Sequence, residues 1–75
     1  MERYGNVSGD SGVEFFEILD HAIKIRFRRG PAYVYDDVRP GDVHVRHMQE
    51  LARAGQGLST YISKYVRNSY SRIEP

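Results

Sequence analysis

The chain contains no cysteine among its 75 residues, which excludes disulfide bonds and thiolate-ligated metal sites. No apolar run approaches the roughly 20 residues that a membrane-spanning helix needs, and the first residues have no signal-peptide core. An excess of one charge is also missing, because 11 Lys and Arg residues face 10 Asp and Glu residues for a net charge of +1. We therefore expect a cytoplasmic protein with no membrane segment, in which any basic surface comes from local clustering.

The chain is short for a protein that must build its own core. A domain of this length buries only roughly 60–65% of the surface of its unfolded chain, so most of its large side chains must pack. This favours core positions for the six tyrosines. The sequence has no internal repeat, low-complexity tract or interdomain linker, which predicts one folded unit.

The strongest structural signal is a β-hairpin over residues 22–36. Apolar and basic side chains alternate from Ile23 to Arg28, which at a period of two places the apolar set on one face and the cations on the other. Tyr33 and Tyr35 alternate with smaller residues on the return strand. Between the strands, Gly30 predicts a three-residue turn in which this glycine takes the left-handed conformation.

This turn sets the register of the hairpin. It pairs Ile25 with Tyr33 and Ile23 with Tyr35, and it places both tyrosines on the apolar face. A two-residue turn would need a positive φ at Arg29, which a long side chain resists, and would turn the tyrosines to the basic face. We prefer the three-residue turn and expect both tyrosines in the core.

A further strand precedes the hairpin. Residues 13–19 favour β structure, and a tight turn at residues 20–21 would pair them with the first hairpin strand. Their apolar positions then agree with the apolar face of the hairpin. The same register leaves Phe15 on the outer face, beside Arg26.

Two amphipathic helices follow the hairpin. Pro40 and Asp42 suit the first turn of a helix, whose apolar positions recur at helical spacing until Gly55 stops it. The second helix has the clearest stripe, with apolar residues at i, i+3, i+4, i+7 and i+8 from Leu58 to Val66.

Both ends of the chain are expected to contribute little to the fold. Residues 1–12 are rich in Gly, Ser, Asn and Asp and carry too little apolar surface to offset their ordering entropy, which predicts a flexible leader. Residues 68–75 are expected to fray, although Tyr70 and Ile73 would extend the apolar stripe if the second helix continued.

Together these elements predict an α+β fold. A three-stranded antiparallel sheet would be followed by two helices packed on one face, in the order β-β-β-α-α. The helices would cover the apolar face of the sheet and leave the basic face exposed. The folded domain would then span residues 13–75.

Several short motifs occur in an order that resembles a known family. Apolar residues alternate at 23–27, Gly30 follows, and then come YVYDDVRP at 33–40 and GLSTYI at 57–62. Over residues 13–72 this order is similar to the KTSC domain, which is named after a carboxy-terminal extension of some lysyl-tRNA synthetases and also occurs in short bacterial and phage proteins. The resemblance implies a KTSC-like domain with no established activity, and its synthetase context suggests RNA binding.

We expect no catalytic, metal or cofactor site. His44, His47 and Glu50 recur at three-residue spacing, but two histidines without a further fixed ligand are more typical of a solvated helix face. Asp36 and Asp37 are adjacent, so on a strand they would point to opposite faces, and Asp at a strand end is ordinary turn chemistry. The serines have no histidine placed by a nucleophile motif. We therefore predict a non-enzymatic protein.

The basic face of the sheet is the better functional candidate. Four cations and one aromatic ring are expected there or at its turn: Phe15, Lys24, Arg26, Arg28 and Arg29. Cations contact phosphates and an aromatic ring stacks on a base, so this set is typical of an interface for single-stranded RNA or tRNA.

Two alternatives for the same face stay open. Its cations could serve solubility alone, paired with acidic neighbours such as Glu17 opposite Lys24. Alternatively, Phe15, Ala32 and Val34 could form the apolar centre of a protein interface rimmed by arginine, which would make the chain an interaction or accessory module.

Overall fold

Strands of the sheet lie side by side in the same order as along the chain. The computed structural model describes residues 1–7, 9 and 11–74, which form a five-stranded antiparallel sheet with the order β1-β2-β3-β4-β5. The strands are β1 (Glu2–Arg3), β2 (Val13–Leu19), β3 (Ala22–Phe27), β4 (Ala32–Asp36) and β5 (Arg72–Glu74), and the helical elements are α1 (Asp42–Ala54), α2 (Leu58–Tyr61) and the π-helical turn η1 (Ile62–Val66).

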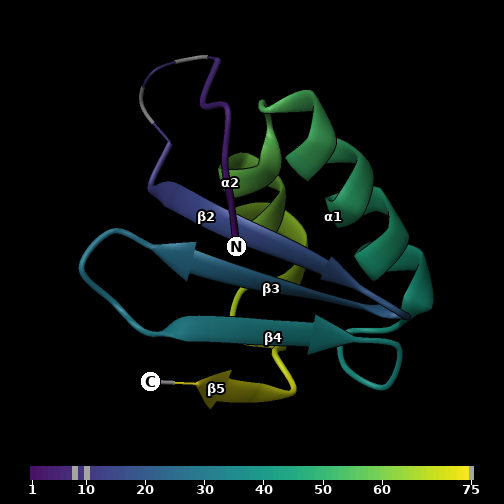
Figure 1. Cartoon of the computed structure of the whole chain (residues 1–75). Coiled ribbons are helices and arrows are strands. Elements are labelled where there is room, and N and C mark those ends of the chain that lie inside the picture. Colours follow the sequence, from purple (N-terminus) through teal and green to yellow (C-terminus); the bar gives the residue numbers. More distant parts are fainter. Residues whose placement is uncertain (8, 10, 75) are drawn as a thin grey trace.

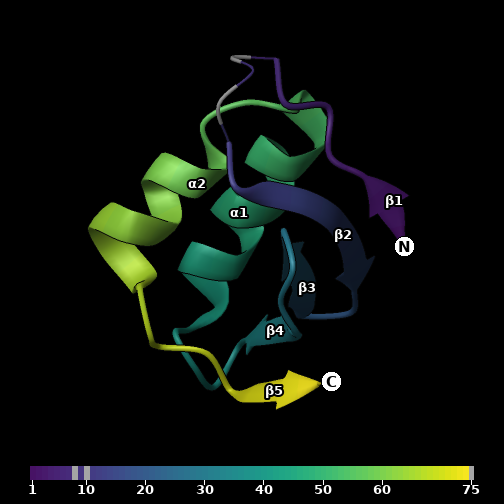
Figure 2. The same ribbon diagram turned by 90° about the vertical axis from the view of Figure 1, so that its left-hand side faces the viewer.

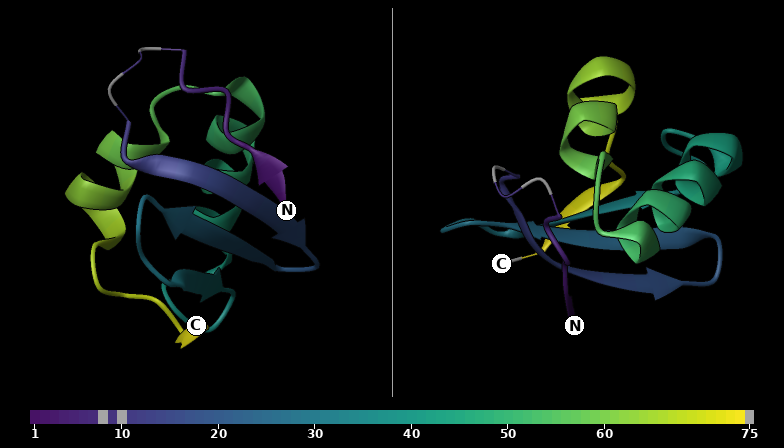
Figure 3. Two further views of the ribbon diagram at one scale, coloured as in Figure 1. Left: turned by 60° about the vertical axis from the view of Figure 1, so that its left-hand side comes forward. Right: turned by 90° about the horizontal axis from the view of Figure 1, so that it is seen from above.

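Both helices lie on the same face of the sheet. The view from above in Figure 3 places α1 and α2 together on one side of the strands, and Figure 2 shows the same division from the edge. This confirms the predicted α+β arrangement with helices on one face, while the sheet has two more strands than expected. None of the helices within the described residues is long and apolar enough to cross a membrane.

The central hairpin of β3 and β4 has the predicted register. Ile25 lies opposite Tyr33 and Ile23 lies opposite Tyr35. Tyr35 is only 2% exposed and Tyr33 packs against the core from its margin, so both tyrosines lie on the helix-covered face, as expected.

The turn that joins these strands differs from the prediction. Arg29 takes the positive φ of 57°, and Gly30 is not in the left-handed region. The backbone N–H of Arg28 donates to the carbonyl of Gly12 at 3.0 Å, so the start of the turn is held by another segment of the chain. The register was therefore right, but the residue assigned to the left-handed position was wrong.

Strand β2 pairs with β3 around the predicted tight turn. Phe16 lies opposite Ile25, and Phe15 lies opposite Arg26. A bulge between Val13 and Phe15 shifts the alternation, so that Val13 and Phe16 are both buried although they are three positions apart, a spacing that would put them on opposite faces of a regular strand.

Helix α1 begins and ends where the sequence predicts. Asp42 lies in its first turn, and Gly55 ends it in the left-handed conformation with a φ of 73°. The side-chain amide of Gln49 donates to the carbonyls of Leu19 and Ala22 at 3.2 and 2.9 Å. These bonds hold the helix over the turn between β2 and β3.

The second helix spans the predicted apolar stripe from Leu58 to Val66, but only its first turn is α-helical. After one α-helical turn the chain continues as the π-helical turn η1, in which each turn of backbone holds more residues. Leu58, Ile62 and Val66 are buried as predicted, but Tyr65 is 61% exposed. The wider turn therefore rotates Tyr65 out of the stripe that a regular helix would have buried.

The amino-terminal residues pack on the domain, which corrects our prediction of a flexible leader over residues 1–12. Strand β1 pairs with the edge of β2. Tyr4 is 3% exposed, and its hydroxyl accepts the N–H of Leu58 at 3.2 Å. The buried ring of Tyr4 supplies enough apolar surface to order the segment, although its average composition is polar. Residues 8 and 10 lie outside the described part.

The carboxy-terminal residues form a second edge strand, which corrects the prediction that residues 68–75 fray. Ile73 of β5 lies opposite Tyr33, and Arg72 lies opposite Val34. The N–H of Ser71 donates to the carbonyl of Val34 at 2.7 Å just before the strand begins. The open edge of β4 thus finds hydrogen-bond partners in the chain itself. Residue 75 lies outside the described part.

The core fills the space between the inner face of the sheet and the helices. Apolar side chains from both layers form one buried cluster: Tyr4, Val13, Phe16, Ile23, Ile25, Tyr35, Val45, Met48, Ala52, Leu58, Ile62 and Val66. Tyr33, Phe27 and Tyr70 pack at its margin.

Candidate nucleic-acid interface

The face of the sheet that points away from the helices, called the outer face below, includes three cross-strand rows, of which the shortest is Leu19, Ala22 and Asp36. One row takes a residue from each strand, β1 to β5 in order: Arg3, Phe15, Arg26, Ala32 and Glu74. The second row runs from β2 to β5: Glu17, Lys24, Val34 and Arg72. Directly opposed residues point to the same side of a sheet, so each row is a line of neighbouring side chains.

Phe15 lies between two arginines in the first row. The guanidinium carbon of Arg3 is 5.3 Å from the centroid of the Phe15 ring, a cation-π contact. Arg26 lies opposite Phe15 on the other side and is exposed. Within residues 1–7, 9 and 11–74, Arg26 forms no ion pair. The predicted neighbours Phe15 and Arg26 are thus brought together, with Arg3 as an additional member.

Lys24 lies opposite Glu17 in the β2–β3 register, as expected. Its ion pair, however, is with a residue of β5, since its Nζ atom is 2.7 Å from Oε1 of Glu74. Nε of Arg72 donates to the other carboxylate oxygen of Glu74 at 2.9 Å. The hydrogen bonds from Lys24 and then from Arg72 lower the pKa of Glu74. Lys24 is therefore the least available of the predicted phosphate contacts.

The bridge from Lys24 to Glu74 crosses β4 and covers its outer side chains. Val34 is 1% exposed and Ala32 is 8% exposed, although both point away from the helices. These two residues therefore cannot form the apolar centre of a protein interface, and that form of the alternative was wrong.

The two remaining predicted cations lie at the end of the hairpin. Arg29 is exposed in the turn. Arg28 is also exposed, but it lines a cavity together with Tyr33 and Tyr35, which belong to the helix-covered side. Arg28 therefore does not extend the outer row of cations as the alternation predicted, because regular pairing ends at Arg26 and Ala32.

Arg3 and Arg72 belong to the outer face but were missed by the sequence analysis. Each lies on a short edge strand, of two and three residues, which is too short to show an alternating pattern. The signal that could have revealed Arg3 is Tyr4 beside it, because a large aromatic residue in a polar segment often marks an anchored position.

The histidines of α1 contact tyrosines of the second helix. His44 Nδ1 and the Tyr61 hydroxyl share a hydrogen bond of 2.7 Å, and the His47 ring lies 4.7 Å from the Tyr61 ring. Burial and then the neighbouring Tyr65 raise the pKa of Tyr61. His44 is thus half-buried against Tyr61, whereas His47 and Glu50 lie exposed, so the expectation of a solvated face is confirmed for His47 and Glu50 but not for His44.

Asp36 has the turn role that the sequence predicted. Its Oδ1 atom accepts the N–H groups of Val38 and Arg39 at 3.1 and 2.9 Å. The hydrogen bond from Arg39 is the main reason that the pKa of Asp36 lies below its usual value. Asp37 is exposed. The two carboxylates therefore serve the loop before α1.

Comparison with protein-family models, with curated proteins and with solved structures found no match for this chain. The resemblance to the KTSC domain therefore stays a prediction from the motifs themselves.

Proposed function

We propose that this domain is a non-enzymatic binding module that contacts single-stranded RNA, including tRNA ends or loops, through its outer face. The observation that carries this proposal is the row Arg3, Phe15 and Arg26, in which an aromatic ring has a cation on each side. Bases stack on aromatic rings and on guanidinium planes, and guanidinium groups pair with phosphates.

The charges of the outer face support an anionic ligand. Its two longer rows hold four cations (Arg3, Lys24, Arg26 and Arg72) and two carboxylates (Glu17 and Glu74), and its shortest row adds the carboxylate of Asp36. Glu74 is engaged by Lys24 and Arg72, which leaves the Arg3 end of the sheet as its most cationic part. Arg29 at the adjacent turn adds a further exposed cation.

The salt dependence of binding tests the proposal. With Arg3, Arg26 and Arg29 each neutralising one phosphate, the log–log slope of affinity against salt for an oligouridylate of about ten nucleotides should be near −2, at about −0.7 per contact. The Arg26→Ala variant should reduce the slope by about 0.7. Arg53→Ala, on the far layer of the fold, is the matched control and should leave the slope unchanged.

Phe15→Ala separates stacking from charge. It should weaken oligouridylate binding by about 1–3 kcal/mol at every salt concentration, since base stacking does not depend on counterion release. Tyr65→Ala removes an exposed ring elsewhere and should have no effect. Two results would contradict the proposed RNA interface. One is no oligouridylate binding at low salt, and the other is equal affinity of Phe15→Ala and Tyr65→Ala for oligouridylate.

A protein partner is the second candidate function, and the observation that favours it lies on the helices. Tyr65 is 61% exposed and stacks on Tyr61 at 4.8 Å, and Val43 on α1 is 79% exposed. Exposed rings and apolar side chains are typical of contacts between proteins. Binding of a partner at this surface should be lost in Tyr65→Ala and should persist at high salt.

A further inference from the structure

Strand β5 forms an edge of the sheet and has one open side. In the order β1-β2-β3-β4-β5 its only neighbour among the described strands is β4. Figure 1 shows β5 at the lower edge of the sheet, and its residues are Arg72, Ile73 and Glu74. An open edge presents backbone N–H and C=O groups with which another strand can pair, so this edge is a candidate for strand addition.

The backbone polar groups of Ile73 point to this open side. The carbonyl of Val34 accepts the N–H of Ser71 at 2.7 Å, so the backbone polar groups of Val34 face β5. Val34 lies opposite Arg72, and opposed residues of an antiparallel pair alternate between hydrogen-bonded and non-hydrogen-bonded pairs. Ile73 follows Arg72 and lies opposite Tyr33, so its N–H and C=O point away from β4.

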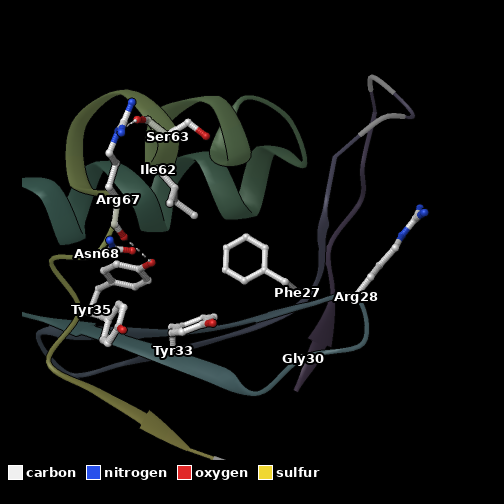
Figure 4. Close-up of a pocket in the computed structure, with 10 residues that line it drawn as sticks. Phe27, Arg28, Gly30, Tyr33, Tyr35, Ile62, Ser63, Arg67 and Asn68 are labelled. Atoms are coloured by element: carbon white, nitrogen blue, oxygen red, sulfur yellow. Dashed lines mark hydrogen bonds between the residues drawn. The ribbon is translucent and has the colours of Figure 1, made fainter.

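The side chain of Ile73 is only partly covered. It is 47% exposed, although it lies opposite Tyr33 on the helix-covered side of the sheet. The ring of Tyr33 contacts the rings of Phe27 and Tyr70, with centroids 5.6 and 4.9 Å apart. Figure 4 shows Tyr33 and Phe27 on the same side of β4. Ile73 is thus the exposed edge of an apolar surface that continues into the core.

The residues on either side of Ile73 carry opposite charges. Nε of Arg72 donates to the carboxylate of Glu74 at 2.9 Å, and the guanidinium group has further N–H groups for a second carboxylate. In an antiparallel pair of two β5 strands centred on Ile73, Arg72 of each copy lies opposite Glu74 of the other. In-register parallel pairing would place Arg72 opposite Arg72, and like charges directly opposite each other are destabilising. The strand is therefore complementary to itself in one orientation.

We infer that the chain forms a dimer by antiparallel pairing of β5 with β5 of a second copy, centred on Ile73. The N–H and C=O groups of the two Ile73 residues bond to each other, and their side chains meet beside Tyr33. Two ion pairs between Arg72 and Glu74 flank this centre. The pair joins the two sheets into one and leaves both outer faces on the same side. The inference does not depend on RNA binding.

The small size of the contact sets the expected affinity. Short length and charged residues often protect an edge strand from pairing. On β5, however, the charges match those of a second copy, and the residue whose backbone groups face outward is apolar and β-branched. Three residues from each copy make a small contact beside the roughly 1,200–2,000 Å² of a stable complex. We therefore expect a dissociation constant on the order of 0.1 to 1 mM.

Sedimentation equilibrium of the whole chain between about 10 μM and about 2 mM tests the inference. The wild type should pass from monomer toward dimer over this range. Ile73→Lys places two cations against each other at the centre of the contact and should raise the dissociation constant about tenfold or more. Val43→Lys is the matched control at an exposed apolar residue of α1 and should dimerise like the wild type.

Charge reversals test the orientation of the pair. Arg72→Glu and Glu74→Arg each place like charges opposite each other, so each variant alone should stay monomeric where the wild type dimerises. An equal mixture of the two variants should dimerise, because every cation then faces a carboxylate of the other variant. Circular dichroism of each variant checks that the fold is retained. Ile73→Lys keeps the inference testable if charge reversal disturbs the bridge from Lys24 to Glu74.

Three results would overturn this inference. They are a wild type that stays monomeric at the highest concentration, an Ile73→Lys variant that dimerises like the wild type, and a mixture of the folded charge variants that associates no more than either variant alone. These experiments contain no RNA. Their outcome is therefore independent of the oligouridylate measurements, and the dimer and the RNA interface can each fail without the other.

Discussion

The two faces of the sheet are made by the same strands, yet different forces organise them. On the inner face, Phe16, Ile25 and Tyr35 are buried against the helices, so removal of apolar surface from water is the main stabilising term. On the outer face, Val34 is equally buried, but its cover is the charged pair Lys24 and Glu74. Burial alone therefore does not identify a residue of the core. Substitutions of charged residues on the outer face should change the free energy of unfolding only slightly.

Tyr35 should give the largest effect on stability. Tyr35→Ala is expected to lower the free energy of unfolding by about 3–5 kcal/mol, because it removes a large ring from a packed site. Arg26→Ala, its counterpart on the outer face, should change stability by less than about 0.5 kcal/mol. Urea unfolding followed by circular dichroism measures both. Similar losses for the two variants would show that the faces do not divide as described.

Tyr4 extends the comparison to the edge of the sheet. Tyr4→Phe keeps the ring but leaves the buried N–H of Leu58 without its acceptor, so unfolding free energy should fall by about 1–3 kcal/mol. Tyr65→Phe is the control at an exposed hydroxyl and should have no measurable effect. A Tyr4→Phe variant that is as stable as the wild type in urea would show that the hydrogen bond between Tyr4 and Leu58 does not stabilise the fold.

Variants of Lys24 separate the contribution of its charge to stability from the contribution of its aliphatic stem. Lys24→Ala removes both the ion pair with Glu74 and the stem over Val34, whereas Lys24→Met keeps a stem of similar length. We expect Lys24→Ala to cost up to about 1 kcal/mol and Lys24→Met to cost less. Thermal unfolding of both variants measures the difference. A larger loss in Lys24→Met would mean that the charge, and not the stem, protects β4.

Lowering the pH should show how much the carboxylates with lowered pKa contribute to the stability of the fold. The pKa of Glu74 is lowered in the folded protein by Lys24 and Arg72, and the pKa of Asp36 is lowered mainly by the Arg39 N–H. A carboxyl with a lowered folded pKa stabilises the fold above its unfolded pKa of about 4 and loses that contribution as pH falls through the folded value.

The corresponding measurement is melting temperature between neutral pH and about pH 3. Wild-type protein should lose a small part of its stability below about pH 4, and Glu74→Gln should lose less. Glu17→Gln is the matched control on the same face and should follow the wild type. If Glu74→Gln and the wild type show the same dependence of melting temperature on pH, then the ion pairs of Glu74 do not stabilise the fold.

The central part of the fold could be predicted because its signals are local. Alternation in residues 23–28 and the tight turn before it determined the register of β2, β3 and β4, and with it the proximity of Phe15 and Arg26. Gly55 and the apolar spacing before it gave the bounds of α1. These signals act within a few residues, so a single sequence displays them.

The edges could not be predicted because they depend on distant partners. Strands β1 and β5 are too short for a periodic pattern, and each forms by pairing with an edge that the rest of the fold supplies. The ion pair of Lys24 with Glu74 exists only through β5, and the contact of Arg3 with Phe15 exists only through β1. The π-helical turn that exposes Tyr65 likewise departs from the regular period that pattern analysis assumes.

The chain-order arrangement of the strands also has a kinetic meaning. Tight turns join β2 to β3 and β3 to β4, so this meander closes through contacts that are near in sequence, whereas β5 reaches β4 only after both helices have been laid down between them. Contacts of short sequence separation form at the lowest entropic cost. We therefore expect amide hydrogens of β3 to exchange with solvent most slowly and those of β5 to exchange early, so the two members of the Lys24–Glu74 bridge come from parts of the molecule that open on different timescales.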